Sequence, residues 1–190
     1  HIILDKTPFY PEGGGQIGDS GFLEFGNKKI NIKNTIKEND SIIHLAEESP
    51  EGFLKRVKAI VNKKTRFLTS INHSCTHILH NALRNILGDH VIQRGSMVNS
   101  KILRFDFSHF SKISESEIKK IEDHVNQIIN KKIKMVEKIN IPIEEALKQG
   151  AIALFDEKYD DKVRVIKFGD SIELCGGTHV NNSSDIKNFK

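Results

Sequence analysis

Several residue types are scarce in this chain of 190 residues, and each scarcity excludes a class of protein. There is no tryptophan, and there are only four prolines and two cysteines. Two cysteines in a chain this long do not form a disulfide framework, so a reducing, cytoplasmic compartment is expected. The longest uninterrupted apolar runs are about five residues, far short of the roughly 20 that a membrane span needs, so no membrane partner is expected.

What is present describes an ordinary globular protein with a mild positive charge. The sequence is 37% apolar and 28% charged, with a net charge of +4. Lysine outnumbers arginine by 23 to 6, so the overall basicity is weak evidence for a nucleic-acid partner. Its distribution says more, because residues 51–105 hold ten Lys or Arg against two acidic residues, a local charge of +8. The positive field is therefore concentrated in the middle of the chain.

The apolar pattern divides the chain into a β part and an α+β part. In residues 1–62, short apolar or β-branched stretches alternate with Gly, Asn and Asp clusters, which predicts a small antiparallel barrel or meander. From about Thr65 to Gly88 the period is helical, and Ser114 and Glu117 form a capping box for a second helix. A short helix is expected over residues 143–149. The expected strands span residues 2–4, 17–25, 30–36, 41–45, 57–61, 102–108, 163–168 and 171–174.

Two histidines on the first predicted helix are spaced to share a metal ion. His73 and His77 lie at i and i+4, which brings their Cβ atoms about 5–6 Å apart on one face. Nine histidines would give roughly 0.4 such pairs by chance, so the spacing alone is weak evidence. His80 and Arg84 share this face, and Cys75 lies opposite in the apolar stripe, so Cys75 is not expected to be a ligand. From the helix alone, a solvated polar face without a ligand is an equally good interpretation.

A second pair with metal-binding potential, Cys175 and His179, follows the last predicted strand. Gly176 and Gly177 between them allow a tight turn with backbone angles closed to other residues, so thiolate and imidazole can point at one centre. Together the two pairs predict a tetrahedral Cys/His₃ site, and zinc is favoured because these ligands suit an ion without redox demands. A metalloprotease is excluded because Ser74 stands where the zincin motif requires Glu.

Three consecutive glycines, Gly13–Gly15, form another unusual stretch. They belong to neither a dinucleotide fingerprint nor a phosphate loop. A turn between two strands is the simpler interpretation, and a backbone surface that lets a bulky partner come close is the functional one. Further along, the polar segment 89–96 joins the histidine helix to the strand that carries Arg104. Its side chains either lie near the same cleft or form a solvated loop.

Four stretches, in order and across nearly the whole chain, carry a family resemblance. They are Leu4–Gln16, Asn72–His80, His90–Ser96 with Leu103–His109, and Cys175–Val180. Together they resemble the editing domain of alanyl-tRNA synthetases. Free-standing trans-editing proteins share the histidine helix and the Cys-to-His loop, and the editing domains of threonyl-tRNA synthetases, which share the second additional domain, are more distant relatives.

The resemblance implies hydrolysis of serine or glycine wrongly esterified to alanine tRNA. A pocket for alanine discriminates against such small differences only about 10 to 200-fold, so a second, hydrolytic sieve is needed. The implied partners are the aminoacylated 3′ end and acceptor stem of alanine tRNA, and the aminoacylation and C-terminal modules of a parent chain. Because the chain opens on His1 rather than Met, we expect it to be a piece of a longer protein.

The resemblance also implies the residues of the site. The implied zinc ligands are His73, His77, Cys175 and His179. Gln93 is expected to recognise the aminoacyl group, because its amide can hydrogen-bond the seryl hydroxyl that alanine lacks. The other candidates are Arg104, with Gln93, for catalysis, and Thr7, Gly13, Gly14, Gly15, Gln16, Gln93 and Ser96 for substrate binding.

The expected architecture is α+β. A small glycine-rich, antiparallel β-barrel-like subdomain (residues 1–62) precedes an α+β editing subdomain (residues 63–190), in which the zinc-bearing helix packs on an antiparallel sheet. Four protein ligands are typical of structural zinc, whereas catalytic zinc keeps a position open, so the metal either activates water or organises the pocket. A zinc-stabilised tRNA-binding module without hydrolytic activity and a free-standing trans-editing deacylase are the alternatives.

Overall fold

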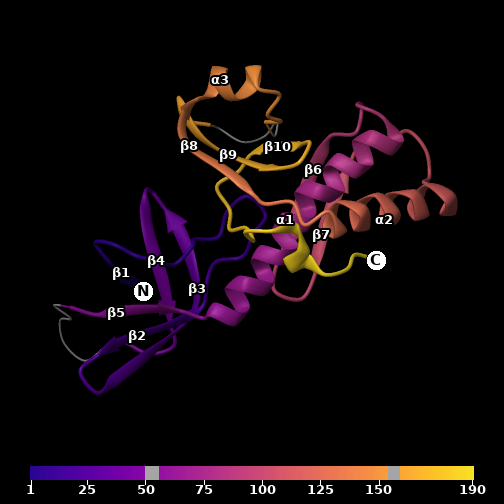
Figure 1. The fold of residues 1–190 in the computed structure, drawn as a ribbon. Coiled ribbons are helices and arrows are strands. Elements are labelled where there is room, and N and C mark those ends of the chain that lie inside the picture. Colours follow the sequence, from indigo (N-terminus) through magenta and orange to yellow (C-terminus); the bar gives the residue numbers. More distant parts are fainter. Residues whose placement is uncertain (50–55, 154–158) are drawn as a thin grey trace.

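The computed structural model describes residues 1–49, 56–153 and 159–190, and the first part of the chain builds one antiparallel sheet. Its strand order is β1-β4-β3-β2-β5 (Figure 1). With β1 and β5 at its edges, the described part of this sheet is open, so the barrel-like form is not confirmed. The antiparallel pairing is confirmed, and β2, β3 and β4 form a meander. The strands are β1 (Ile2–Ile3), β2 (Gly21–Phe25), β3 (Lys28–Glu38), β4 (Ser41–Ala46) and β5 (Lys58–Val61).

Tight turns and an apolar face explain why this sheet forms. Gly26 lies between β2 and β3 with φ +55°, and Asn39 and Asp40 lie between β3 and β4 with φ 44° and 67°. Two-residue loops of positive φ match the twist of antiparallel hairpins. One face of the sheet then buries a cluster made of Phe9, Leu23, Ile30 and Ile32.

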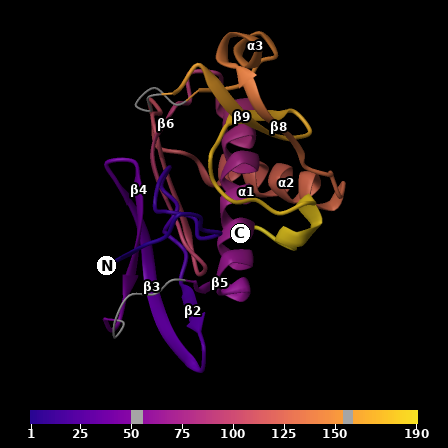
Figure 2. The same ribbon diagram turned by 90° about the vertical axis from the view of Figure 1, so that its left-hand side faces the viewer.

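A long helix, α1 (Lys63–Leu87), is the central element of the molecule. Asn62 caps its first turn by accepting a hydrogen bond from the Thr65 amide, and Gly88 ends it with φ 117°. The five-stranded sheet lies to one side of α1, near its N-terminal end, and the small sheet with α3 lies at the top of both views (Figure 1 and Figure 2). The apolar face of α1 packs against α2 (Glu115–Asn130), whose predicted capping box is confirmed.

The remaining elements form a hairpin, a small sheet and two short helices. The hairpin pairs β6 (Gln93–Val98) with β7 (Leu103–Phe107). The small sheet has the antiparallel order β10-β9-β8. Among the residues that the structure describes, no helix combines the length and the apolar character needed to cross a membrane. The other bounds are β8 (Val136–Pro142), α3 (Ile143–Lys148), β9 (Lys162–Phe168), β10 (Ser171–Leu174) and η1 (Ser183–Ile186).

The α+β class is thus confirmed, but two strands were missed by the sequence patterns. Strand β8 is almost entirely exposed, so it lacks the alternation of apolar and polar residues that marks a half-buried strand. Strand β6 contains Gly95 and a register shift against β7, which weakens its strand signal. The segment interpreted as a joining loop is therefore, from Gln93 onward, a paired strand.

Several contacts cross the boundary predicted between residues 62 and 63. Arg66 of α1 forms an ion pair with Asp19. The Ile17 amide donates to the Val98 carbonyl at 3.0 Å, and the Val98 amide donates to the Gly15 carbonyl at 2.8 Å. The glycine-rich loop is thereby fixed onto β6, beside α1. The division into two subdomains itself stays a prediction.

Candidate metal centre

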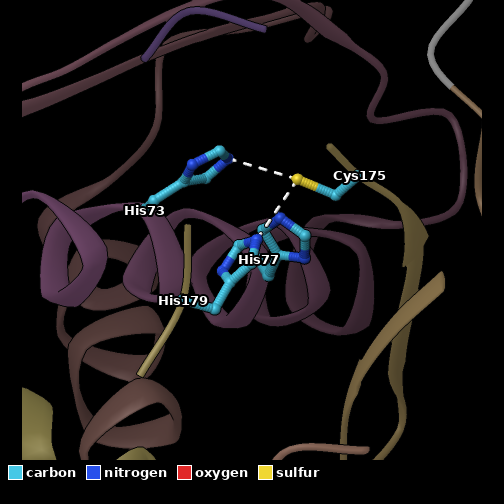
Figure 3. A group of neighbouring side chains, drawn as sticks. All are labelled: His73, His77, Cys175 and His179. Atoms are coloured by element: carbon cyan, nitrogen blue, oxygen red, sulfur yellow. Dashed lines mark hydrogen bonds between the residues drawn. The ribbon is translucent and has the colours of Figure 1, made fainter. Parts of the chain in front are cut away.

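Four side chains from α1 and the loop after β10 converge on one point. They are His73, His77, Cys175 and His179, and one ligand atom of each lies within 4.8 Å of the others. Cys175 Sγ is 3.4 Å from His73 Nε2 and 3.2 Å from His179 Nε2 (Figure 3). The two pairs recognised in the sequence therefore form one group in space.

The helix face that carries these histidines is buried. His73 is 5% exposed and His77 is 3% exposed. The interpretation of this face as solvated is therefore wrong, because β10 and the Cys175 loop cover it. Cys75 lies in the hydrophobic core outside the group, as predicted, and burial raises the pKa of its thiol to about 12.

His73 and His179 turn one ring nitrogen toward the thiol and the other toward an outer partner. His73 Nδ1 lies 2.6 Å from Gln16 Oε1, and His179 Nδ1 lies 3.2 Å from Ser74 Oγ. The Nε2 atoms of both rings face Cys175. Metal-binding histidines show this arrangement, because a partner on the second nitrogen fixes the ring and raises the basicity of the ligating one.

A buried carboxylate occupies the corresponding position behind the third histidine. Glu173 Oε2 lies 3.6 Å from His77 Nδ1, and Glu173 Oε1 accepts a hydrogen bond from His80 Nδ1 at 3.0 Å. Burial raises the pKa of this carboxyl, but attraction to the His77 ring in its protonated form and the hydrogen bond from His80 outweigh burial and hold the pKa below its usual value. A carboxylate therefore lies behind the candidate ligand His77.

Burial keeps the three histidines of the group neutral. It lowers the pKa of His73 to about 3, with further lowering by the neighbouring His77 and Arg164. Burial also lowers the pKa of His77 against the attraction of Glu173, and lowers that of His179 well below its usual value. A neutral imidazole offers a lone pair, which is the form that binds a metal ion.

Two of the distances in this group fit zinc. Tetrahedral zinc with Zn–S of about 2.3 Å and Zn–N of about 2.0–2.1 Å places sulfur and nitrogen ligands about 3.6 Å apart. The two sulfur–nitrogen distances, 3.4 and 3.2 Å, differ from that value by only a few tenths of an ångström. Three imidazoles and one thiol are also a ligand set that zinc accepts.

Hydrogen bonds and a glycine shape the loop that carries Cys175. The Arg164 guanidinium donates to the carbonyl oxygens of Cys175 at 3.0 Å and Gly177 at 2.6 Å. Neither Gly176 nor Gly177 has a φ between +20° and +160°, so the expectation of special backbone angles is wrong. Gly177 is needed for space, because a Cβ there would lie 2.0 Å from His73 Cε1.

A cavity of about 440 Å³ adjoins the candidate metal group. This volume is within the range of small-molecule sites. Three of the four candidate ligands line it, so the metal position faces the cavity rather than the core. The lining residues are Tyr10, Gly13, Gly14, Lys37, His73, Thr76, His77, Gln93, Ser96, Glu173, Leu174, Cys175, Gly176 and Gly177.

Four of the predicted substrate residues, Gly13, Gly14, Gln93 and Ser96, line this cavity. The glycine stretch is indeed a tight turn, with φ of +56° at Gly14 and +77° at Gly15. A Cβ on Gly15 would lie 2.1 Å from Ser96 Oγ, so this turn can approach β6 only as glycine. The turn interpretation is therefore confirmed, and the close approach of Gly15 is to β6 of the same chain, so the approach of a bulky partner stays a prediction.

The other predicted residues lie outside the cavity lining. Thr7 Oγ1 lies 2.7 Å from His44 Nε2, within the five-stranded sheet. The Arg104 side chain is 63% exposed and pairs with Asp106. Gln16 is buried behind the metal group. The roles predicted for these residues stay predictions.

Sequence reasoning missed several residues that line the cavity or hold it. Lys37 reaches it from β3, a contact that only the tertiary fold reveals. Arg164 was also missed, since its role depends on two backbone carbonyls. Glu173 had a usable signal, because it is an acidic residue two positions before the candidate ligand Cys175.

Two family models match this chain. Residues 1–65 match the model of class II tRNA synthetases (A), and residues 163–190 match the model of the second additional domain of threonyl and alanyl tRNA synthetases. The two models thus match the two ends of the chain.

Relatives cover the chain from end to end. Alanine--tRNA ligases from Christiangramia forsetii, Cytophaga hutchinsonii and Flavobacterium psychrophilum are 55%, 54% and 52% identical to it over 190, 191 and 198 residues. These matches cover 100% of this chain and 22% of each relative, so the chain spans about a fifth of their length. The family indicated by the four sequence stretches is thus confirmed, and the chain belongs to the alanyl-tRNA synthetases.

Proposed function

We propose that this chain hydrolyses the ester bond of alanine tRNA that carries serine or glycine in place of alanine. The observation that supports this most is the opening of the candidate metal group onto a cavity with polar walls, in a chain related to alanine--tRNA ligases. A ligase that selects alanine by size discriminates weakly against such small competitors. A second, hydrolytic site therefore has a clear task.

The cavity walls supply the groups that such a substrate needs. The Gln93 amide, on β6, is proposed to hydrogen-bond the seryl hydroxyl. The Gly13–Gly14 backbone, without side chains, lets the ester approach the metal group. Lys37 provides a cation in the lining, suited to a phosphate of the terminal nucleotides. Zinc, when bound by the four ligands, would supply a Lewis acid that polarises the ester carbonyl or an attacking water.

The proposed partners and location follow from the same assignment. The tRNA would present its aminoacylated 3′ end to the cavity, while the rest of a parent synthetase would hold the acceptor stem. Both cysteines are free thiols, which suits a reducing compartment such as the cytoplasm.

One observation favours a second candidate, a zinc-stabilised tRNA-binding module without hydrolysis. Four protein side chains are enough to close a tetrahedral zinc site, and closed sites are typically structural. In that case the cavity would hold the aminoacylated end without reaction.

The test measures hydrolysis of two substrates, alanine tRNA charged with serine and alanine tRNA charged with alanine. The wild-type chain and two histidine variants are compared. His73→Ala removes a candidate ligand and should slow seryl-tRNA hydrolysis by at least about 100-fold. His124→Ala, on α2 and outside the candidate group, should keep the wild-type rate. Circular dichroism confirms that each variant is folded.

Two outcomes would overturn the proposal. Wild-type rates from a folded His73→Ala variant would remove the metal group from the reaction. Binding of seryl-tRNA by the wild-type chain without any deacylation would establish the binding module instead.

A further inference from the structure

We propose that Gln16 is a positioning residue for the metal group: its side-chain oxygen fixes the tautomer of His73 and so aims His73 Nε2 at the metal position. The inference rests on the proposed zinc site. It gives Gln16 a role different from the substrate binding predicted for it from the sequence. It also explains why the glycine-rich turn ends on a glutamine at this point.

The first step is to establish which end of the Gln16 amide faces the metal group. The backbone amide of Thr178 lies 3.0 Å from Gln16 Oε1, and the Thr178 hydroxyl lies 3.2 Å from the same atom. A backbone N–H can only donate. The atom that faces it must therefore be an acceptor, so the oxygen of Gln16, and not its nitrogen, occupies this position.

The second step carries this assignment to the imidazole. His73 Nδ1 lies 2.6 Å from the same Gln16 Oε1. An amide oxygen only accepts, so Nδ1 must carry the hydrogen and donate it. A neutral imidazole has one N–H, and Nε2 is left with its lone pair. That lone pair is on the nitrogen 3.4 Å from Cys175 Sγ.

The third step is that the backbone of the Cys175 loop packs closely against the His73 ring. A Cβ on Gly177 would lie 2.0 Å from His73 Cε1 and 2.3 Å from Nδ1, so the loop backbone is packed against this edge of the ring. Gln16 itself is 1% exposed and is not part of the cavity lining. The residue therefore acts on the metal group from behind.

The same amide joins three distant parts of the chain. The backbone N–H and carbonyl of Gln16 are hydrogen-bonded to the backbone of Gly13, within the glycine-rich turn. The side-chain oxygen of Gln16 contacts His73 on α1 and Thr178 in the Cys175 loop. Assembly of the turn on α1 would thus prepare His73 for the metal. Loss of the Gln16 oxygen removes the acceptor for both neighbours at once.

The side-chain nitrogen of Gln16 indicates which substitutions should preserve its role. Within the described part of the chain, Gln16 Nε2 is buried without a hydrogen-bond partner. The oxygen is therefore the part of the amide that the metal group uses. Gln16→Glu keeps an acceptor facing His73 and Thr178 and has no donor to leave unpaired, whereas Gln16→Met keeps the length and loses the acceptor.

The test measures zinc affinity by competition with a chelator, together with the ¹⁵N NMR shifts of the His73 ring. Gln16→Met should weaken zinc binding about 10 to 100-fold, as loss of an outer partner does. Gln16→Glu should restore affinity to within a few-fold of wild type. Gln127→Met, on α2, is the matched control, since it makes the same change outside the metal group and should leave zinc affinity unchanged.

The NMR measurement needs no variant and no metal. In the metal-free wild-type chain, His73 should carry its proton on Nδ1. A proton on Nε2, or wild-type zinc affinity in Gln16→Met, would overturn the role of Gln16. Failure of the wild-type chain to bind zinc would overturn the proposed metal site instead, while the tautomer would still decide whether Gln16 orients His73.

Discussion

The buried histidine of the five-stranded sheet and the three histidines around Cys175 differ in where their ring nitrogens point. His44 Nδ1 lies 3.0 Å from the Ile2 carbonyl, and its Nε2 lies 2.7 Å from Thr7 Oγ1. The carbonyl can only accept, so Nδ1 donates, and Nε2 accepts from the hydroxyl. Both nitrogens of His44 are thus satisfied by the protein itself.

Two rings of the metal group use only one nitrogen in this way, because His73 and His179 bond to outer partners through Nδ1 and present Nε2 to a thiol. Among the described residues His77 Nδ1 has no hydrogen-bond partner, and a Glu173 oxygen lies 3.6 Å from it. Burial lowers the pKa of His44 as it lowers those of the group. A buried, neutral histidine is therefore not by itself the sign of a metal site. The sign is a set of imidazole lone pairs that converge on a thiol.

The largest expected difference between the two histidine environments is in the effect of zinc on the free energy of unfolding. A ligand at about 1,000 times its dissociation constant adds about 4 kcal/mol to the free energy of unfolding. Cys175→Ala should lose nearly all of that gain, because it removes the one sulfur ligand. His44→Gln should be less stable than wild type but keep the full zinc-dependent gain. Urea denaturation with and without zinc makes the measurement.

Either of two results would contradict the comparison. A zinc-dependent gain that survives Cys175→Ala would place the ion elsewhere. A folded His44→Gln variant without the gain would show that the two histidine environments are not independent.

A smaller effect is expected at the carboxylate behind His77. Glu173→Gln should weaken zinc binding about 10 to 100-fold, or about 1.4–2.7 kcal/mol, because a neutral amide makes His77 a weaker base. Glu24→Gln is the control, since this carboxylate pairs with Lys29 and Lys58 of the five-stranded sheet. Chelator competition gives both affinities, and equal values for Glu173→Gln and wild type would exclude Glu173 from the metal group.

Stability measured against pH on the metal-free chain tests the property that the two histidine environments share, which is the lowering of the histidine pKa by burial. Burial holds the pKa of His44 below its usual 6.5, so the unfolded chain binds more protons than the folded chain below that pH. The stabilisation is present above pH 6.5 and is lost as the pH falls. His44→Gln should reduce the slope of the free energy of unfolding against pH by up to about 1.4 kcal/mol per pH unit. Urea unfolding at several pH values measures this slope. An unchanged slope would show that His44 binds a proton as readily in the folded chain as in the unfolded chain.

The sequence predicted those parts of the site that depend on local periodicity. The spacing of His73 and His77 and the opposite position of Cys75 follow from helical geometry alone. The pairing of this face with Cys175 and His179 needed motif recognition, because nothing local brings β10 onto α1. The role that we propose for Gln16 escaped both approaches, since it depends on side-chain contacts with residues far away in the sequence.

Charge is the property that changed most between sequence and structure. The +8 counted over residues 51–105 includes Arg66 and Arg104. Their partners, Asp19 and Asp106, lie outside that range of the sequence but within 4 Å in space. The local excess is therefore smaller in the folded chain. A count along the sequence cannot detect this, because ion pairs form across elements.

The smallest effect, and the finest test of the comparison, concerns the two cysteines. Cys75→Ala should cost about 1 kcal/mol of stability, the size expected for one buried atom, and leave zinc affinity unchanged. At about pH 8 an alkylating reagent should modify Cys175 of the metal-free chain and spare Cys75, because the reactive form is the thiolate and burial raises the pKa of Cys75 to about 12.

Zinc should then protect Cys175 and change nothing at Cys75, which mass spectrometry of the digested protein would show. Modification of Cys75 in the folded chain would mean that α1 opens on its core side. Failure of zinc to protect Cys175 would mean that the thiol is not a ligand. Two residues of one chemical type, both reduced, would thus behave differently because one faces the apolar core and the other faces three imidazole nitrogens.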